Sequence, residues 1–163
     1  QPFVFVNSLV NGKAMIACTD MTLDLSTISF SSDGIELLGK MLGTADLLAQ
    51  LGDIAYLEKL PALYEECREA GIGEYRDELD MIRKAPAFYD VAEKRLQTSL
   101  DSTYRFMELH FEHRWGQRRN VYQEIIDSQK DFLINIINKP NTDPRDFLNR
   151  WRPPENLLNF CDR

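Results

Sequence analysis

The stretch "SFSSDGIELLGKMLGTADLLAQLGD", residues 29–53, predicts one long α-helix and sets the fold class. Ser31 or Ser32 stands at the position of an N-cap, and Asp33 follows in the first turn, where a carboxylate interacts favourably with the helix dipole. Apolar residues then recur at steps of three and four until about Gly52. We expect this segment to be the central helix of the protein.

The rest of the chain shows the same helical spacing, interrupted by Gly, Pro or N-cap residues. Helices are predicted over residues 55–73, 75–101, 102–115 and 118–139, and a short one begins at Asp143 and Pro144. Gly71 and Gly73 are expected to end the first of these, Gly116 to break the chain after the third, and Asn120 or a neighbour to start the fourth. We expect a kink at Pro61 and a break or kink at Pro86, because proline lacks an amide donor and disfavours helical geometry in the residue before it. The predicted fold is all-α, a bundle of about five to seven helices in a single domain over residues 1–163.

The first thirty residues carry a mixed signal. The motif "PFVFV" at residues 2–6 has the composition of a β-strand, whereas Phe5, Leu9 and Ile16 lie near helical spacing. We favour a helix that ends near Cys18 and is followed by an irregular connection to the central helix.

Composition and charge limit the classes of partner. With 44% hydrophobic and 28% charged residues, the chain is ordinary for one soluble globular domain. Its net charge of −7 argues against nucleic acid or a membrane as partner, because phosphate binding needs a basic surface. No stretch approaches the ~18 apolar residues of a membrane span. Cys18, Cys67 and Cys161 show no CxxC spacing, so we expect reduced thiols in a cytoplasmic protein.

Four residues of the central helix, Gly43, Asp46, Gln50 and Asp53, lie three or four positions apart, so a helix places them in one stripe. Apolar residues flank the stripe on both sides. A helix with so much apolar circumference is expected to be buried, and the stripe then faces a cleft or other polar groups. A buried, ionised Asp46 requires a cation, such as a metal ion, or hydrogen-bond donors nearby. The alternative is a set of carboxylates that face solvent or accept hydrogen bonds from a helix end.

Two segments resemble a known family. "LLGKMLGTADLLAQLGDIAYLEKLPALYEECREAG" (37–71) and "YRFMELHFEHRWGQRRNVYQEII" (104–126) resemble the later half of bacterial HD-domain proteins, a branch of the metal-dependent phosphohydrolase superfamily. In that superfamily an early His, a His-Asp pair and a distant Asp bind a divalent metal, which activates water for attack on a phosphate ester. The resemblance implies that Asp46, in "GTADLL", corresponds to the distant Asp and is a metal ligand. Gln50 and Asp53 match the wider pattern and are possible ligand contacts.

The chain also departs from the family pattern. No His precedes Asp46 and no His-Asp dipeptide occurs, so the other expected ligands are missing. Because the sequence also starts at Gln1, we expect the C-terminal, HD-domain-like portion of a longer protein; loss of the metal site is the other interpretation. The intact parent is then expected to use Mg, Mn or Fe on a small phosphate-ester substrate, with no catalytic metal bound by this chain alone and no activity. The alternative function is a non-catalytic helical module with a binding or regulatory role.

The segment "HRWGQRR", residues 113–119, is the only dense basic patch. Arg114, Arg118 and Arg119 around Trp115 can hold an anion, a phosphate-bearing ligand or an acidic helix. The alternative is a solvated helix end with the indole packed beneath it.

The two histidines, His110 and His113, lie three positions apart but lack a third ligand at a suitable spacing. Met107 stands where a ferritin-like Glu-x-x-His motif requires Glu. We therefore expect exposed or capping histidines. Aromatic residues at helical spacing are expected in the core: Phe88, Tyr89, Tyr104, Phe106, Phe111 and Tyr122.

Overall fold

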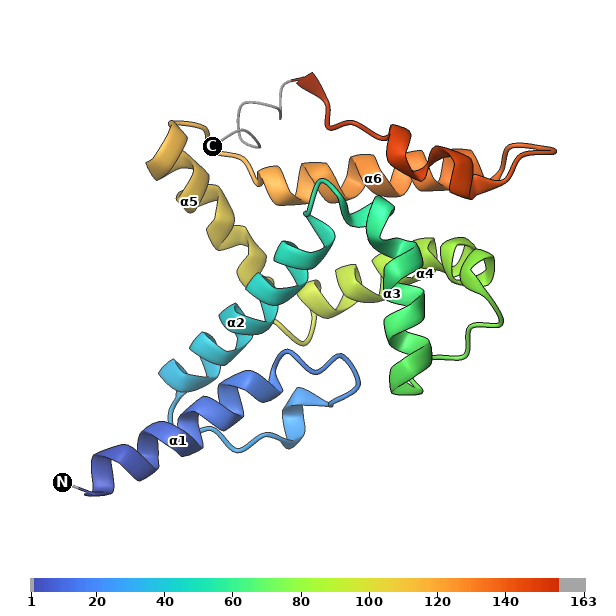
Figure 1. The fold of residues 1–163 in the computed structure, drawn as a ribbon. Coiled ribbons are helices and arrows are strands. Elements are labelled where there is room, and N and C mark those ends of the chain that lie inside the picture. Colours follow the sequence, from blue (N-terminus) through green and yellow to red (C-terminus); the bar gives the residue numbers. More distant parts are fainter. Residues whose placement is uncertain (1, 156–163) are drawn as a thin grey trace. The chain divides into compact units, whose positions relative to one another are not determined.

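The computed structural model describes residues 2–155, with side chains from residue 9 onward, and this part of the chain is all-α as predicted (Figure 1). No β-strand occurs between residues 2 and 155, and α-helices cover well over half of the chain. The α-helices of this part are α1 (Pro2–Ala17), α2 (Asp33–Leu51), α3 (Tyr56–Ala70), α4 (Glu78–Gln97), α5 (Phe106–Trp115) and α6 (Val121–Ile137). Short 3-10 helices are η1 (Leu25–Thr27), η2 (Thr103–Arg105) and η3 (Pro144–Arg150).

The chain divides into two compact units, each built from two separated segments. Unit 1 contains Gln1–Ala49 and Ala92–Arg119, and unit 2 contains Gln50–Val91 and Asn120–Arg163. The divisions therefore fall inside α2 and inside α4. The single-domain organisation expected from the sequence stays a prediction.

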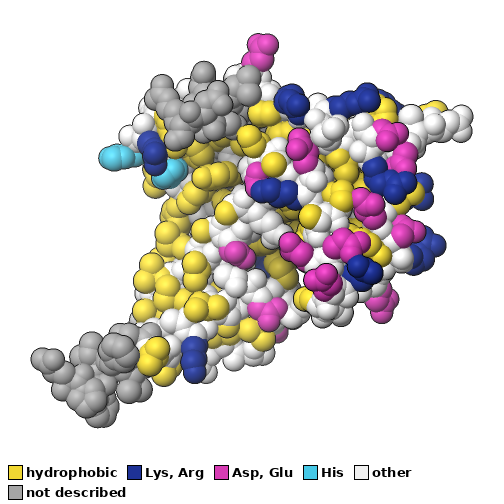
Figure 2. Space-filling model, viewed as in Figure 1, with side chains coloured by type: hydrophobic (Ala, Val, Ile, Leu, Met, Phe, Trp, Pro, Cys, Tyr) yellow, Lys and Arg dark blue, Asp and Glu magenta, His cyan; other side chains and the backbone are white. Residues whose placement is uncertain are grey.

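The start of α2 follows the predicted capping. The amide N–H of Ile35 donates to Ser32 Oγ at 3.3 Å and to the Ser32 carbonyl at 3.0 Å, so Ser32 is the N-cap. The burial of α2 differs from the prediction, because Leu38 and Leu42 are exposed while Leu48 is buried. The helix is covered on one face only. Figure 2 shows hydrophobic side chains on the surface over α2.

Most of the large apolar side chains that the described residues expose belong to unit 1. They lie on three helices: Leu9, Val10 and Ile16 on α1, Leu37, Leu38 and Leu42 on α2, and Phe106 and Leu109 on α5. The placement of Phe106 contradicts its predicted role in the core, whereas Tyr89 and Phe111 are buried as predicted. Helical spacing places a side chain on one face of its helix, but a second helix must cover that face before it becomes core.

Two glycines let α2 approach the end of α1. A Cβ on Gly39 would lie 2.8 Å from Cys18 Sγ, and a Cβ on Gly43 would lie 2.5 Å from the Cys18 carbonyl oxygen. Real Cβ atoms do not tolerate such distances, so both positions require glycine for steric reasons. Gly43 is therefore buried in a helix contact and is not part of a polar stripe.

Arg95 of α4 holds the irregular connection that follows α1. Its guanidinium donates to the carbonyl oxygens of Cys18 at 3.3 Å, Asp20 at 2.6 Å and Leu23 at 3.2 Å. Its Nε is the one buried side-chain nitrogen or oxygen among the described residues that lacks a hydrogen-bond partner. The positive charge is thus stabilised by carbonyl dipoles, and the loop is closed onto unit 1.

Cys18 itself is buried and reduced, and burial raises the pKa of its thiol. Cys67 is half-buried and also carries a free thiol, as predicted, whereas Cys161 lies outside the described residues.

The helices of unit 2 begin and end mostly at the predicted residues. Gly71 ends α3 in the left-handed conformation at φ 66°, and Asp143 caps η3 by accepting from the Arg145 amide at 3.0 Å. Of the break or kink predicted at Pro86, the break is wrong, because α4 continues through this residue, and the kink stays a prediction. The carbonyl of Ile82 loses one helical donor there, but the buried side chains of Ile82 and Tyr89 on either side hold the helix in place.

The segment between α5 and α6 ends one helix and starts the next, as predicted. Gly116 ends α5 in the left-handed conformation at φ 69°. Asn120 then caps α6, since its side-chain oxygen accepts from the Gln123 amide at 3.3 Å. None of the helices between residues 2 and 155 combines the length and the apolar character that crossing a membrane requires.

Replacing Gly43 with alanine tests the close approach of α2 and the end of α1. The new methyl would overlap the Cys18 carbonyl, so we expect the Gly43→Ala variant to lose roughly 1–3 kcal/mol of unfolding free energy, the usual cost of overpacking. Urea denaturation measures the loss. Gly12→Ala in α1 is the matched control: a Cβ there meets nothing within 4 Å, and alanine has the higher helix propensity. Equal stability of the two variants would contradict the contact.

Candidate functional site

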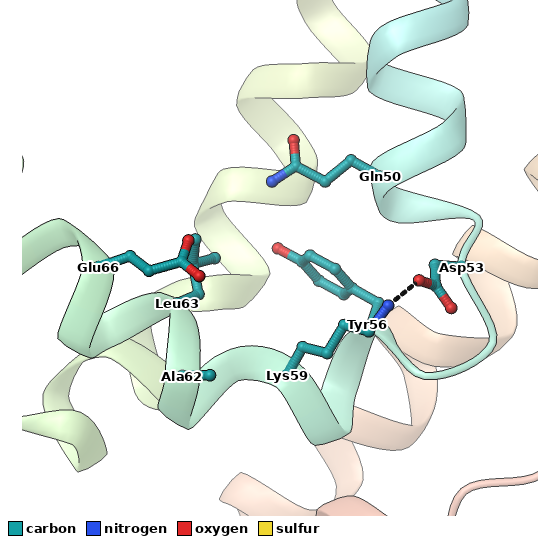
Figure 3. Close-up of a pocket in the computed structure, with 7 residues that line it drawn as sticks. All are labelled: Gln50, Asp53, Tyr56, Lys59, Ala62, Leu63 and Glu66. Atoms are coloured by element: carbon teal, nitrogen blue, oxygen red, sulfur yellow. Dashed lines mark hydrogen bonds and ion pairs between the residues drawn. The ribbon is translucent and has the colours of Figure 1, made fainter.

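A cavity of about 230 Å³ lies in unit 2, where the chain turns from the end of α2 into α3 (Figure 3). It is lined by seven residues: Gln50, Asp53, Tyr56, Lys59, Ala62, Leu63 and Glu66. Those from Tyr56 to Glu66 recur at steps of three and four, so they come from one face of α3. Gln50 and Asp53 close the cavity from the end of α2 and the following turn.

Asp53 organises the turn between the two helices. Its Oδ1 accepts the amide of Ala55 at 2.8 Å, and its Oδ2 pairs with the Lys59 ammonium. Burial alone would raise the pKa of the Asp53 carboxyl, but the hydrogen bonds from Lys59 and Ala55 outweigh it and lower that pKa. The carboxylate therefore stays ionised at the start of α3, where a negative charge also favours the helix dipole.

A buried hydrogen-bond network holds this turn in place. The Gln129 side chain is fully buried, and its Nε2 donates to the Asp53 carbonyl at 2.8 Å. Its Oε1 accepts from the Tyr89 hydroxyl at 3.3 Å. The Tyr89 ring meets the Tyr56 ring edge-on, with centroids 5.8 Å apart. Gln129 thus joins α6, α4 and the Asp53 turn, and it supports the aromatic wall of the cavity.

Three polar groups of the cavity have no hydrogen-bond or ion-pair partner in the described part of the chain. Figure 3 shows the Gln50 amide, the Tyr56 hydroxyl and the Glu66 carboxylate directed toward the same space. None of these three groups makes a hydrogen bond or an ion pair with another residue between 9 and 155. Burial raises the pKa of the Tyr56 phenol, which is therefore neutral at physiological pH. The cavity offers a carboxylate, an amide and a neutral hydroxyl above the apolar side chains of Ala62 and Leu63.

The structure keeps only part of the predicted polar stripe. Asp46 and Gln50 are both exposed on α2, and of these two only Gln50 lines the cavity of unit 2, together with Asp53. Asp53 lies beyond the end of α2, since the helix stops at Leu51. The single polar stripe on a mostly buried helix is therefore wrong. Ligand contacts by Gln50 and Asp53 stay a prediction.

The described residues do not fit a divalent metal. Between residues 9 and 155, no group of three or more His, Cys, Asp and Glu side chains lies close enough together to hold a metal ion. A single exposed carboxylate such as Asp46 cannot satisfy the six or more oxygen ligands that a hard cation requires. Metal binding by Asp46 stays a prediction, and we derive no chemical step from it.

The basic segment at the end of α5 is engaged within unit 1. The Arg114 guanidinium stacks over the Trp115 ring at 4.8 Å, and the His110 ring meets that indole edge-on at 5.6 Å. Arg118 Nε lies 3.9 Å from a Glu112 carboxylate oxygen. The histidines are exposed, as expected from their spacing. Anion binding by Arg114, Arg118 and Arg119 stays a prediction.

Sequence reasoning missed the residues that shape the cavity, Tyr56, Glu66 and Gln129. Gln129 carried a usable signal, because it is a polar residue in the buried stripe of α6, four positions after Ile125 and four before Leu133. No protein-family model, curated protein or solved structure matches the chain. The candidate site is therefore assigned from its geometry.

Replacing Gln129 with leucine tests the buried network. The Gln129→Leu variant removes the donor to the Asp53 carbonyl and leaves the buried Tyr89 hydroxyl without its acceptor, so we expect a loss of about 2–3 kcal/mol in unfolding free energy. Gln123→Leu on the same helix is the control, because that side chain bonds at the surface. Adding Tyr89→Phe should cost less in the Gln129→Leu background than in the original protein, and strictly additive losses would contradict the network.

The pH dependence of stability tests the Asp53 ion pair. Because the folded-state pKa of Asp53 lies below its unfolded value of about 3.9, its contribution is present above that pH and is lost as the pH falls through the folded-state pKa. We expect the Asp53→Asn variant to have a lower unfolding free energy than the original protein at pH 6. The difference between the two unfolding free energies should shrink as the pH falls below about 4. Chemical denaturation at each pH gives the comparison. The effect should shrink in a Lys59→Met background, and a difference that does not change with pH would exclude the ion pair as its source.

Proposed function

We propose that this chain is a helical binding module whose cavity at the turn between α2 and α3 takes a small polar ligand. One observation carries the proposal: the unpartnered polar groups of Gln50, Tyr56 and Glu66 converge on a cavity. Polar groups that converge on a partly apolar cavity are the usual composition of a small-molecule site. The buried Gln129 network favours binding as well, because a preformed wall loses little conformational entropy when the ligand arrives.

The cavity limits the size of the ligand. A volume of about 230 Å³ equals on the order of seven or eight water molecules in the liquid. A ligand with a similar number of heavy atoms fills it. With about 0.3–1.5 kcal/mol available per heavy atom, a ligand of this size gains roughly 2–12 kcal/mol on binding, so its Kd is at best about nanomolar.

The HD-type phosphohydrolase is the second candidate. It is supported by the resemblance of residues 37–71 and 104–126 and by the exposed Asp46 carboxylate, which makes no hydrogen bond or ion pair with another residue between 9 and 155. Phosphate-ester hydrolysis that requires Mn²⁺ and disappears in Asp46→Ala would favour this candidate over the binding module.

Substitutions in the cavity test the binding function. We expect a screen of small polar metabolites by two-dimensional NMR to find compounds that shift the amide signals of Gln50, Asp53 and Tyr56. Tyr56→Phe and Gln50→Ala should each weaken binding by roughly three- to tenfold, the value of one hydrogen bond. Asp46→Asn is the control, because this exposed side chain lies outside the cavity; it should leave affinity unchanged and alter stability by less than about 1 kcal/mol. Unchanged affinity in both cavity variants would refute the assignment.

A further inference from the structure

We infer that the ligand of this cavity is a small organic cation, an aliphatic amine with a short apolar chain. The inference rests on the proposed binding function and specifies the class of its ligand. It depends on which charges in the cavity are already neutralised and on which hydrogen-bonding groups remain.

The charges that line the cavity do not cancel. The carboxylate of Asp53 is neutralised by the Lys59 ammonium. The carboxylate of Glu66 has no cationic partner among residues 9–155. The lining therefore carries one uncompensated negative charge. The surrounding unit adds to it, since unit 2 carries nearly all of the net charge of −7. An anionic ligand is repelled by this field and a cationic ligand is attracted.

The remaining polar groups match the hydrogen bonding of an ammonium. A primary ammonium has three donors and no acceptor. The Glu66 carboxylate and the Tyr56 hydroxyl offer acceptor oxygens, and the Gln50 amide presents its oxygen by rotation about its terminal bond. The three groups point into the same space from α2 and α3 (Figure 3). Each ammonium donor thus has one acceptor in the cavity.

The rest of the cavity accepts a short hydrocarbon chain. Ala62 and Leu63 supply aliphatic surface, and the Tyr56 ring supplies an aromatic wall. Lys59 is held away by its bond to Asp53, so its ammonium does not compete for Glu66. A chain of about four carbons with one terminal amine matches the polarity of the space and leaves room in its volume for roughly two or three water molecules.

Three probes of one size but different charge test the inference: n-butylamine, n-butanol and butyrate. Each is titrated into the full chain at pH 7 and low salt, and two-dimensional NMR follows the backbone amides of Gln50, Asp53, Tyr56 and Glu66. We expect butylamine to shift these signals saturably, butanol to shift them less and butyrate not at all. Glu66→Gln should weaken butylamine binding by roughly fivefold, the size of an exposed ion pair.

The matched control is Glu69→Gln, which removes the same charge from an exposed position one turn further along α3, outside the cavity. It should leave butylamine affinity nearly unchanged. Equal weakening by the two variants, or binding of butanol or butyrate as tight as that of butylamine, overturns the cation inference and leaves the binding function standing. If none of the three probes shifts the cavity signals, the cation inference fails, and the metabolite screen alone decides the binding function.

Discussion

The buried amide of Gln129 is the constraint on which unit 2 and its cavity depend. The Gln129 amide is fully buried, so both its nitrogen and its oxygen need hydrogen-bond partners. A buried polar group without a partner costs about 1–3 kcal/mol, a large share of the about 5–15 kcal/mol that stabilises a typical domain. Gln129 finds them in the Asp53 carbonyl and the Tyr89 hydroxyl, which belong to distant parts of the chain. Helix α6 therefore cannot shift along its axis or rotate without breaking a bond at one end of the amide. The position of the turn before α3, and with it the orientation of Tyr56, follows from this requirement.

Asp53 shows how one residue serves both the fold and the site. Its carbonyl accepts from the Tyr56 amide at 2.9 Å as well as from Gln129, while its carboxylate binds Ala55 and Lys59. The backbone contacts hold the turn from which α3 begins, and the ion pair neutralises Lys59, the cation that lines the cavity. The ion pair thus leaves Glu66 as the carboxylate that is not neutralised. The ion pair that stabilises the turn before α3 therefore also sets the charge that a ligand meets.

The sequence predicts where the helices begin and end better than it predicts which of their side chains are buried or line the cavity. Ser32, Gly71 and Asn120 begin or end helices as predicted, because a cap depends on the residue itself and on the few amides next to it. Pro86 was expected to break or kink a helix, but α4 continues through it, because the buried side chains on either side outweigh the local preference for a break. The same limit applies to Asp46 and Gln50: both are exposed on the same side of α2, yet only Gln50 lines the cavity of unit 2. Periodicity describes one helix, whereas exposure and site membership depend on partners that are remote in sequence.

The interleaved order of the two units has a consequence for biosynthesis. Unit 1 needs residues 92–119 to complete a structure begun by residues 1–49, and unit 2 needs residues 120–163 to complete one begun by residues 50–91. A ribosome therefore releases the first half of each unit before the second half of either. During translation Lys40 and Thr44 of α2 wait for their partners Asp101 and Thr103 while the helices of unit 2 are already emerging, and Gln129 arrives after both of its own partners. Every C-terminal truncation before α6 leaves unit 2 without its buried amide, so nascent chains of intermediate length are the species most in need of a chaperone.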